Sequence, residues 1–308
     1  MTERIRHLAT SVGSVALPNP IMTASGTSGH GAELGRYVDL GTLGAVVCKS
    51  LLVDPWPGNP APRVHETPAG MLNSVGLQGP GVRHWLDEDV PVLVASGARI
   101  VASLWGRTVE DYAEAAAVLA DAPPEVVAVE VNVSCPNHHA RHEIFAHDPR
   151  ATAEVVAVTA ACGRPRWAKL SPNVSDLVPV VAAAVEAGAE AVTLVNTLMG
   201  MSIDIEARAG RLGGRGGGLS GPAIHPVAVR AVWDVHAALP EVPIVGVGGV
   251  ASGHDAIEFL MAGASAVQVG TATFANPRAT AEVLAEVGAW CDRRGVTNLA
   301  ELIGVAHG

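Results

Sequence analysis

The chain has 308 residues, a length that suits one (β/α)₈ barrel or two small domains. Apolar residues make up 49% of it and charged residues 16%, which excludes a disordered or fibrous protein and provides for a large core. A formal net charge of −10, without any block of Lys and Arg, argues against a nucleic-acid-binding protein. The N-terminus lacks the apolar run of a signal peptide and no apolar stretch is long enough to span a membrane, so the sequence predicts a cytoplasmic protein.

Eight short segments rich in β-branched residues recur along the chain, with helical patterns between them. Several are apolar without alternation, which is typical of strands that are buried on both faces of a parallel sheet. The segments are residues 15–25, 43–50, 99–106, 125–134, 166–171, 191–197, 242–250 and 264–274. The strict alternation predicts one domain over residues 1–308, a (β/α)₈ TIM barrel, with a doubly wound open sheet as the alternative.

Capping residues mark the ends of the helical patterns. Thr108 and Ser175 precede helical stretches and are expected to be N-caps. Gly163, Gly188 and Gly263 follow helical stretches and are expected to end them.

The interval after the second strand is about twice as long as the others and is rich in Pro and Gly (DPWPGNPAPRVHETPAGMLNSVGLQGPG). Loops of this length are uncommon inside a compact domain unless they have a function. Because a barrel carries its chemistry on the loops that follow its strands, we expect this long insertion to form a wall or lid of the site. A plain surface loop is the alternative.

The last two predicted strands end in glycine-rich turns. GVGG contains Gly248 and Gly249, and VGTA contains Gly270 and Thr271. Backbone N–H groups and helix N-termini at these two turns commonly bind phosphate in barrels. The sequence therefore predicts a phosphate site here, with tight turns that bind nothing as the alternative.

Two lysines, Lys49 and Lys169, lie on strands that are otherwise apolar. A lysine in a buried strand needs an anion or an electron-rich partner, and no acidic residue recurs at the neighbouring strand ends. A cofactor ring that becomes anionic on reduction would satisfy both lysines, and a Schiff-base lysine is a second functional possibility. A buried ion pair and an extended side chain that reaches solvent are the structural alternatives.

The four cysteines lie far apart and form no CxxC motif, which argues against disulfides, a zinc ribbon or an iron–sulfur cluster within this chain. Cys135 follows a predicted strand and lies between Asn132 and Asn137 in the sequence, so it is a candidate nucleophile or base.

The histidines of the following HHARHEIFAH segment lack the carboxylates or thiols that would complete a metal site, and no metal is predicted. The remaining cysteines are expected to be core residues: Cys48, Cys162 and Cys291.

Several motifs together resemble the dihydroorotate dehydrogenase family over nearly the whole chain. They are NSVGLQ (residues 73–78), NVSCPN (132–137), NTLMGM (196–201), GLSGPAI (218–224) and the two glycine turns. The chain is most similar to the class 1B catalytic subunits. Cysteine in NVSCPN is typical of the soluble class 1 enzymes, and the NTLMGMSID segment favours the NAD-linked subclass.

The resemblance implies oxidation of (S)-dihydroorotate to orotate in pyrimidine biosynthesis, with FMN accepting a hydride while Cys135 takes a proton. Lys169 would stabilise the anionic reduced flavin. The implied substrate-binding residues are Lys49, Asn73, Ser74, Val75, Gly76, Leu77, Asn132, Asn137, Asn196 and Thr197. The implied FMN-binding residues are Ser25, Lys49, Ser50, Ser103, Asn132, Lys169, Val195, Gly221, Gly248, Gly249, Gly270 and Thr271.

The resemblance also implies a homodimer and a separate electron-transfer subunit that carries FAD and a [2Fe–2S] cluster and reduces NAD⁺.

The chain departs from the family pattern in three places. Ser103 and Gly79 stand where the family usually has Asn, and HHARHEIFA replaces a glycine-containing loop. Three alternatives remain: an FMN enzyme acting on another pyrimidine, similar to dihydropyrimidine dehydrogenase; a flavin-free barrel lyase with a Schiff-base lysine; and a non-catalytic binding barrel.

Overall fold

The centre of the molecule is an eight-stranded parallel sheet in this computed structural model, which describes residues 8–134, 144–214 and 216–308. Its strand order is β3-β16-β15-β10-β9-β8-β7-β4. A parallel bridge between Met22 and Ala45 joins the first and last strands and closes the sheet. The strands are β3 (Ile21–Thr23), β4 (Val46–Val47), β7 (Ile100–Leu104), β8 (Val126–Asn132), β9 (Arg166–Lys169), β10 (Ala191–Leu194), β15 (Ile244–Val247) and β16 (Ala266–Val269). The predicted (β/α)₈ barrel is therefore confirmed and the open sheet is excluded.

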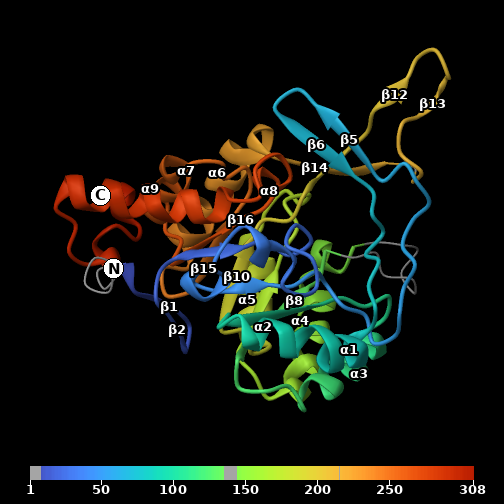
Figure 1. Cartoon of the computed structure of the whole chain (residues 1–308), viewed down its shortest axis with the longest axis horizontal. Helices are drawn as coiled ribbons and strands as arrows, with labels where there is room; N and C mark the ends of the chain where they lie inside the picture. The colour runs from blue at the N-terminus through green and yellow to red at the C-terminus, as the bar shows by residue number, and fades with distance from the viewer. Residues whose placement is uncertain (1–7, 135–143, 215) are drawn as a thin grey trace.

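Helices follow the strands and cover the outside of the barrel (Figure 1). The α-helices are α1 (Val82–His84), α2 (Val90–Ala95), α3 (Val109–Leu119), α4 (Pro149–Val158), α5 (Val178–Glu186), α6 (His225–Ala238), α7 (Gly253–Met261), α8 (Ala272–Ala275) and α9 (Ala279–Arg294). The other helical turns are η2 (Glu33–Arg36), η3 (Leu40–Thr42), η4 (Trp85–Asp89), η5 (Phe145–His147), η6 (Thr159–Cys162), η7 (Pro222–Ile224), η8 (Leu299–Glu301) and η9 (Val305–His307).

Of the two predicted N-caps, Thr108 and Ser175, one is confirmed by the structure. The side chain of Thr108 accepts a hydrogen bond from the backbone N–H of Asp111 and caps α3, as predicted. The prediction for Ser175 is wrong: α5 begins at Val178, and the Asp176 carboxylate accepts the Val178 N–H at 3.0 Å. Aspartate directly beside the helix start supplies the acceptor that serine was expected to supply.

The bottom of the barrel is closed by a hairpin of β1 (Thr10–Val12) and β2 (Val15–Leu17). Its apolar side chains form one cluster with inward-facing strand residues, among them the fully buried Trp167. The remaining interior is mainly aliphatic, so few aromatic rings are needed. The packed bottom leaves the carboxyl ends of the strands as the end that is free to form a site.

A second, four-stranded antiparallel sheet contains strands from two distant parts of the chain (Figure 1). The long segment between β4 and β7 folds back as a hairpin of β5 (Val64–Thr67) and β6 (Gly70–Asn73). β6 pairs with β14 (Gly217–Ser220), which pairs with β11 (Leu198–Gly200). A further hairpin, β12 (Ile203–Asp204) and β13 (Ala209–Gly210), projects from this region. Within the described residues, no helix combines the length and apolarity that crossing a membrane requires.

The start of α3 makes a testable contribution to stability through Asp111. Burial acts to raise the pKa of Asp111, but hydrogen bonds from Arg107 and its charge outweigh burial and hold the pKa below the usual 3.8. The Arg107 side chain donates to the Asp111 carboxylate at 2.9 and 3.0 Å. Asp111→Asn is expected to lower the free energy of unfolding at pH 7 by about 1–3 kcal/mol.

The pH dependence follows from the direction of the pKa shift. Because the folded-state pKa of Asp111 is depressed, its stabilisation is fully present above pH 3.8 and is lost as the pH falls through the folded-state value. Denaturant titrations of both proteins at pH 7 and below pH 3.8 measure the difference. A difference that stays constant over this range would contradict the assignment. Asp121→Asn is the control, since the Arg83–Asp121 pair is exposed and is expected to contribute under about 1 kcal/mol.

Candidate active site

A cavity of about 270 Å³ opens at the carboxyl ends of the barrel strands, beside the second sheet. Its lining comes from the ends of the barrel strands, the β5–β6 segment and the β14–η7 connection. The lining residues are Ala24, Ser25, Gly26, Thr27, Lys49, Ser50, Val64, Met71, Asn73, Val75, Gly76, Leu77, Asn132, Ser134, Lys169, Val195, Asn196, Thr197, Ser220, Gly221, Ile224, Val247, Gly248, Gly249, Gly270, Thr271 and Phe274. Most of the predicted site residues thus share one cavity.

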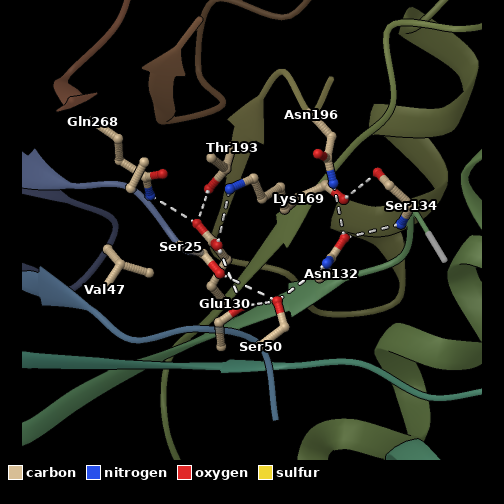
Figure 2. Close-up of polar contacts among 12 residues, drawn as sticks. Ser25, Val47, Ser50, Glu130, Asn132, Ser134, Lys169, Thr193, Asn196 and Gln268 are labelled. Carbon is tan, nitrogen blue, oxygen red and sulfur yellow. Dashed lines mark hydrogen bonds and ion pairs between the residues drawn. The ribbon is translucent and has the colours of Figure 1, made fainter. Parts of the chain in front are cut away.

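Two asparagine amides at the cavity have fixed orientations. Asn132 Nδ2 donates to Ser50 Oγ at 3.2 Å, and Asn132 Oδ1 accepts from Asn196 Nδ2 at 3.1 Å and from the Ser134 N–H at 3.2 Å (Figure 2). Asn196 Oδ1 in turn accepts the Thr197 N–H at 2.8 Å. Because each amide carries donors and an acceptor in one plane, this arrangement suits a ring on which C=O and N–H groups alternate.

The Val75–Gly76–Leu77 segment presents its backbone to the cavity. Asn59 N–H donates to the Val75 carbonyl at 3.0 Å, and Trp56 Nε1 donates to the Gly76 carbonyl at 3.0 Å. In a trans peptide the N–H points opposite to the carbonyl, so the N–H groups that follow point away from Asn59 and Trp56. Gly76 and Leu77 both have positive φ, 72° and 61°. Such a run of N–H groups is suited to binding a carboxylate.

The buried lysine of the cavity has an acidic partner, so the buried ion pair given as an alternative is present, although the sequence did not identify the acid. Lys169 Nζ lies 3.4 Å from Glu130 Oε1, and both side chains are almost completely buried. Glu130 is in the middle of β8 and not at a strand end, which is why a search of the strand ends missed it. The feature that could have identified Glu130 is the one that identified the two lysines: a charged residue within an otherwise apolar strand.

Glycine is required at the turns that follow β15 and at the start of η7. Gly248, Gly249 and Gly221 have φ values of 144°, 71° and 89°. A Cβ on Gly248 would lie 2.6 Å from the Cβ of Ala228, and one on Gly249 would lie 2.8 Å from the Gly221 carbonyl oxygen. Side chains would therefore both strain the backbone and fill the space where the two turns meet. Beside them, Thr271 Oγ1 donates to Ser220 Oγ at 2.8 Å.

Four predicted residues are not among the cavity lining. Ser74 accepts a hydrogen bond from Asn59 Nδ2 at 3.0 Å. Ser103 is fully buried behind Ser50, with the two hydroxyl oxygens 2.9 Å apart. Cys135 and Asn137 lie outside the described residues. The lining residues that were not among the predicted site residues are Ala24, Gly26, Thr27, Val64, Met71, Ser134, Ser220, Ile224, Val247 and Phe274.

The other three cysteines are buried core residues, as predicted. Burial raises the pKa of the Cys48 thiol to about 12, and burial also raises the pKa values of Cys162 and Cys291. All three therefore remain thiols at neutral pH and are poor nucleophiles. Among residues 8–134, 144–214 and 216–308, no three His, Cys, Asp or Glu side chains group as metal ligands would.

Known proteins are similar to this chain over nearly its whole length. Residues 7–290 match the family model described as dihydroorotate dehydrogenase. The chain is 48% identical over 299 residues to a protein of Alkaliphilus metalliredigens named dihydroorotate dehydrogenase B (NAD(+)), catalytic subunit, covering 97% of this chain and 98% of the relative. Proteins of the same name from Trichlorobacter lovleyi and Desulforudis audaxviator are 48% and 47% identical, with 98% and 97% of this chain and 99% and 97% of the relatives covered.

Proposed function

The chain belongs to the dihydroorotate dehydrogenase family, and we propose that it oxidises (S)-dihydroorotate to orotate in pyrimidine biosynthesis as the catalytic subunit of an NAD-linked enzyme. One observation carries this proposal. A single cavity brings together oriented amides, a row of backbone N–H groups, a buried lysine and a glycine cradle. These match the ring, the carboxylate and the phosphorylated flavin that this reaction requires.

FMN fits the residues that are present. Gly221, Gly248 and Gly249 line the cavity in positive-φ turns that carry no side chain, so their backbone N–H groups can closely approach a phosphate. Lys169 provides the positive charge that favours an anionic reduced ring. When bound, FMN would supply a ring that accepts the hydride from the substrate. The proposed flavin-binding residues also include Ser25, Lys49, Ser50, Ser103, Asn132, Val195, Gly270 and Thr271.

We assign the substrate to the amide side of the cavity. Asn73, Asn132, Asn196 and Thr197 would hydrogen-bond the pyrimidine, while the N–H groups of Val75, Gly76 and Leu77 would hold its carboxylate. Ser74, Asn137 and Lys49 complete the proposed set. Lys49 lines the cavity and adds positive charge beside an anionic substrate.

Cys135 is proposed as the base that removes a proton from C5 of the substrate. It follows directly after Ser134, which lines the cavity. The other cysteines are excluded from this role by their burial and raised pKa values. Because the thiolate is the active form, a base in this position needs a polar environment, and Asn132 and Asn137 stand near it in the sequence.

The electrons leave through a partner in this proposal. The relatives are named catalytic subunits and NAD(+) enzymes, which supports a second subunit. We propose that it carries FAD and a [2Fe–2S] cluster, that this chain forms a homodimer, and that the enzyme works in the cytoplasm, as the resemblance to class 1B enzymes implies.

The decisive experiment is anaerobic reduction of the bound flavin. The loss of the flavin's visible absorbance measures this reduction. Dihydroorotate is expected to bleach the flavin, while dihydrouracil and dihydrothymine, which lack the carboxylate, are not. Bleaching by the latter two would indicate an enzyme acting on another pyrimidine. Purified protein without FMN would contradict the proposal and favour a Schiff-base lyase or a binding protein.

Trp56 offers a test of the carboxylate-binding segment. Its indole N–H is the group that holds the Gly76 carbonyl at 3.0 Å, while its ring packs edge-on against Trp105 and under Arg107. Trp56→Phe keeps an aromatic ring and removes only the hydrogen-bond donor. Loss of one such bond is worth about 0.5–1.5 kcal/mol, so the Kd for orotate is expected to rise about 2- to 12-fold with FMN content unchanged.

Orotate titration of the oxidised flavin spectrum measures this Kd. Trp290→Phe is the matched control, because Trp290 also packs under an arginine, Arg294, but lies on α9 and does not line the cavity. Equal orotate affinities for the Trp56 variant and the control would show that the hydrogen bond does not position the segment.

A further inference from the structure

Glu130 is the hub of a polar cluster inside the barrel, next to the cavity (Figure 2). Its Oε2 accepts from Gln268 Nε2 at 2.7 Å and from Thr193 Oγ1 at 3.2 Å. Its Oε1 accepts from Lys169 Nζ at 3.4 Å and from Ser103 Oγ at 3.5 Å. A carboxyl group that accepts from four donors is an ionised carboxylate. A full negative charge is therefore held directly beside Lys169.

A path of hydroxyl groups connects this charge to the cavity. Ser103 donates to Glu130, so Ser50 donates to Ser103 across 2.9 Å. Ser25 then donates to Ser50 across 3.2 Å, and Asn132 Nδ2 donates to the same oxygen. All these dipoles point toward Glu130. The negative charge thus orients the polar floor of the cavity as well as the lysine.

Lys169 lines the cavity, whereas Glu130 does not. A bound ring that gains negative charge is attracted by the ammonium group and repelled by the carboxylate behind it. In a site with little water, two opposite charges 3.4 Å apart partly cancel each other's field at a third point. The net stabilisation of an anionic ring is consequently smaller than the lysine alone would provide.

We propose that Glu130 is a positioning residue and counter-charge for Lys169 that limits the stabilisation of the anionic reduced flavin. This inference rests on the proposed flavin enzyme and adds a residue to it that the sequence motifs do not include. The consequence suits an enzyme whose electrons must move on to a partner, because a strongly stabilised reduced flavin would retain them. Glu130 does not contact the substrate and takes no proton from it.

Sulfite provides a test that does not depend on turnover. It adds to the oxidised flavin and leaves negative charge on the ring, so its Kd reports the positive potential around the flavin. Glu130→Gln removes the charge at nearly constant volume and is expected to lower the sulfite Kd at least tenfold. The midpoint potential of the flavin is a second readout, and dye equilibration measures it. A tenfold change in the equilibrium between oxidised and reduced flavin corresponds to about 30 mV in the two-electron midpoint potential.

Two further variants make the result unambiguous. Thr193→Val removes one hydrogen bond to Glu130 but keeps its charge, and its sulfite Kd is expected to stay within about twofold of the wild-type value. Glu130→Met is a second neutral replacement that places no amide N–H beside Lys169, and it is expected to shift the Kd in the same direction as Glu130→Gln.

The outcomes separate this inference from the proposed function. Wild-type protein that binds FMN and is bleached by dihydroorotate establishes the function, whatever the variants do. An unchanged or raised sulfite Kd in the neutral variants overturns the role of Glu130. Failure of both neutral variants to fold or retain flavin also overturns it, because Glu130 would then serve folding or binding and not the potential. A shift in Thr193→Val as large as that in Glu130→Gln would assign the effect to local packing.

Discussion

Replacing Cys135 by alanine is expected to leave FMN bound and to slow the reduction of the flavin by dihydroorotate by about 10²–10⁴-fold, the usual effect of losing a general base. The reaction removes a proton from C5 and a hydride from C6, so a missing base raises its barrier even when the flavin is in place. Cysteine suits this role because its thiolate is accessible near neutral pH in a polar site. Anaerobic stopped-flow spectroscopy at saturating dihydroorotate measures the rate.

Cys291→Ala is the control for this experiment. Cys291 is fully buried on α9, and burial raises the pKa of its thiol, so its loss affects packing and not proton transfer. This variant is expected to reduce its flavin at the wild-type rate while losing some stability. If Cys135→Ala also keeps the wild-type rate, another group removes the proton and the assignment of the base is wrong.

The barrel could be predicted from sequence because its determinants are local. Each barrel strand lies within a segment predicted from its apolar, β-branched residues, and each of the described strands is shorter than predicted. In most segments the apolar residues continue past the last ladder hydrogen bond into the turns. The segment 15–25 instead holds two strands of different sheets, β2 and β3, and the segment 264–274 runs into α8. Periodicity reports burial, and burial extends beyond the paired residues. The false cap at Ser175 has a similar origin, since two acceptors, Ser175 and Asp176, precede the same helix.

The second sheet could not be predicted in the same way. Gly218 pairs with Asn73, and only the closed barrel brings these two segments together. Strand pairing over such a separation leaves no periodic pattern in either segment. The long interval was expected to be a wall or lid of the site because of its length and its place after a barrel strand. The β5–β6 hairpin now shows how that interval is built, since β6 and the residues after it contribute Asn73 and the Val75–Leu77 backbone to the cavity.

The site itself was partly predictable, because parallel strands place their carboxyl ends together. This rule located Lys49, Asn132, Lys169 and Asn196, all of which line the cavity. The rule misses residues that lie deeper in the barrel, before the last residues of a strand. Glu130 lies two residues before Asn132 on β8, on the same face of the strand, and so points into the barrel beneath it. Reading every second residue inward from each strand end would have found it.

Gly249→Ala is expected to weaken FMN binding at least about 100-fold, or about 3 kcal/mol. Gly249 has φ of 71°, a conformation that costs an L-residue about 1–2 kcal/mol. Its new methyl group would lie 2.7 Å from His225 Cβ and 2.8 Å from the Gly221 carbonyl oxygen. His225 cannot easily retreat, because its ring bonds the Gly248 carbonyl at 3.0 Å and Glu258 at 3.1 Å. The turn must therefore move, and the proposed phosphate cradle moves with it.

Gly163→Ala is the control for Gly249→Ala. It tests whether replacing a glycine of positive φ outside the cavity also weakens FMN binding. Gly163 has nearly the same φ, 62°, but nothing lies within 4 Å of the position its Cβ would take, and it does not line the cavity. It is expected to cost about 1–2 kcal/mol of stability and to bind FMN normally. Quenching of free FMN fluorescence by the apoprotein gives both dissociation constants, and denaturant titration gives the stabilities. Wild-type affinity in Gly249→Ala would place the phosphate elsewhere, because a rigid cradle cannot accept this methyl group without losing its geometry.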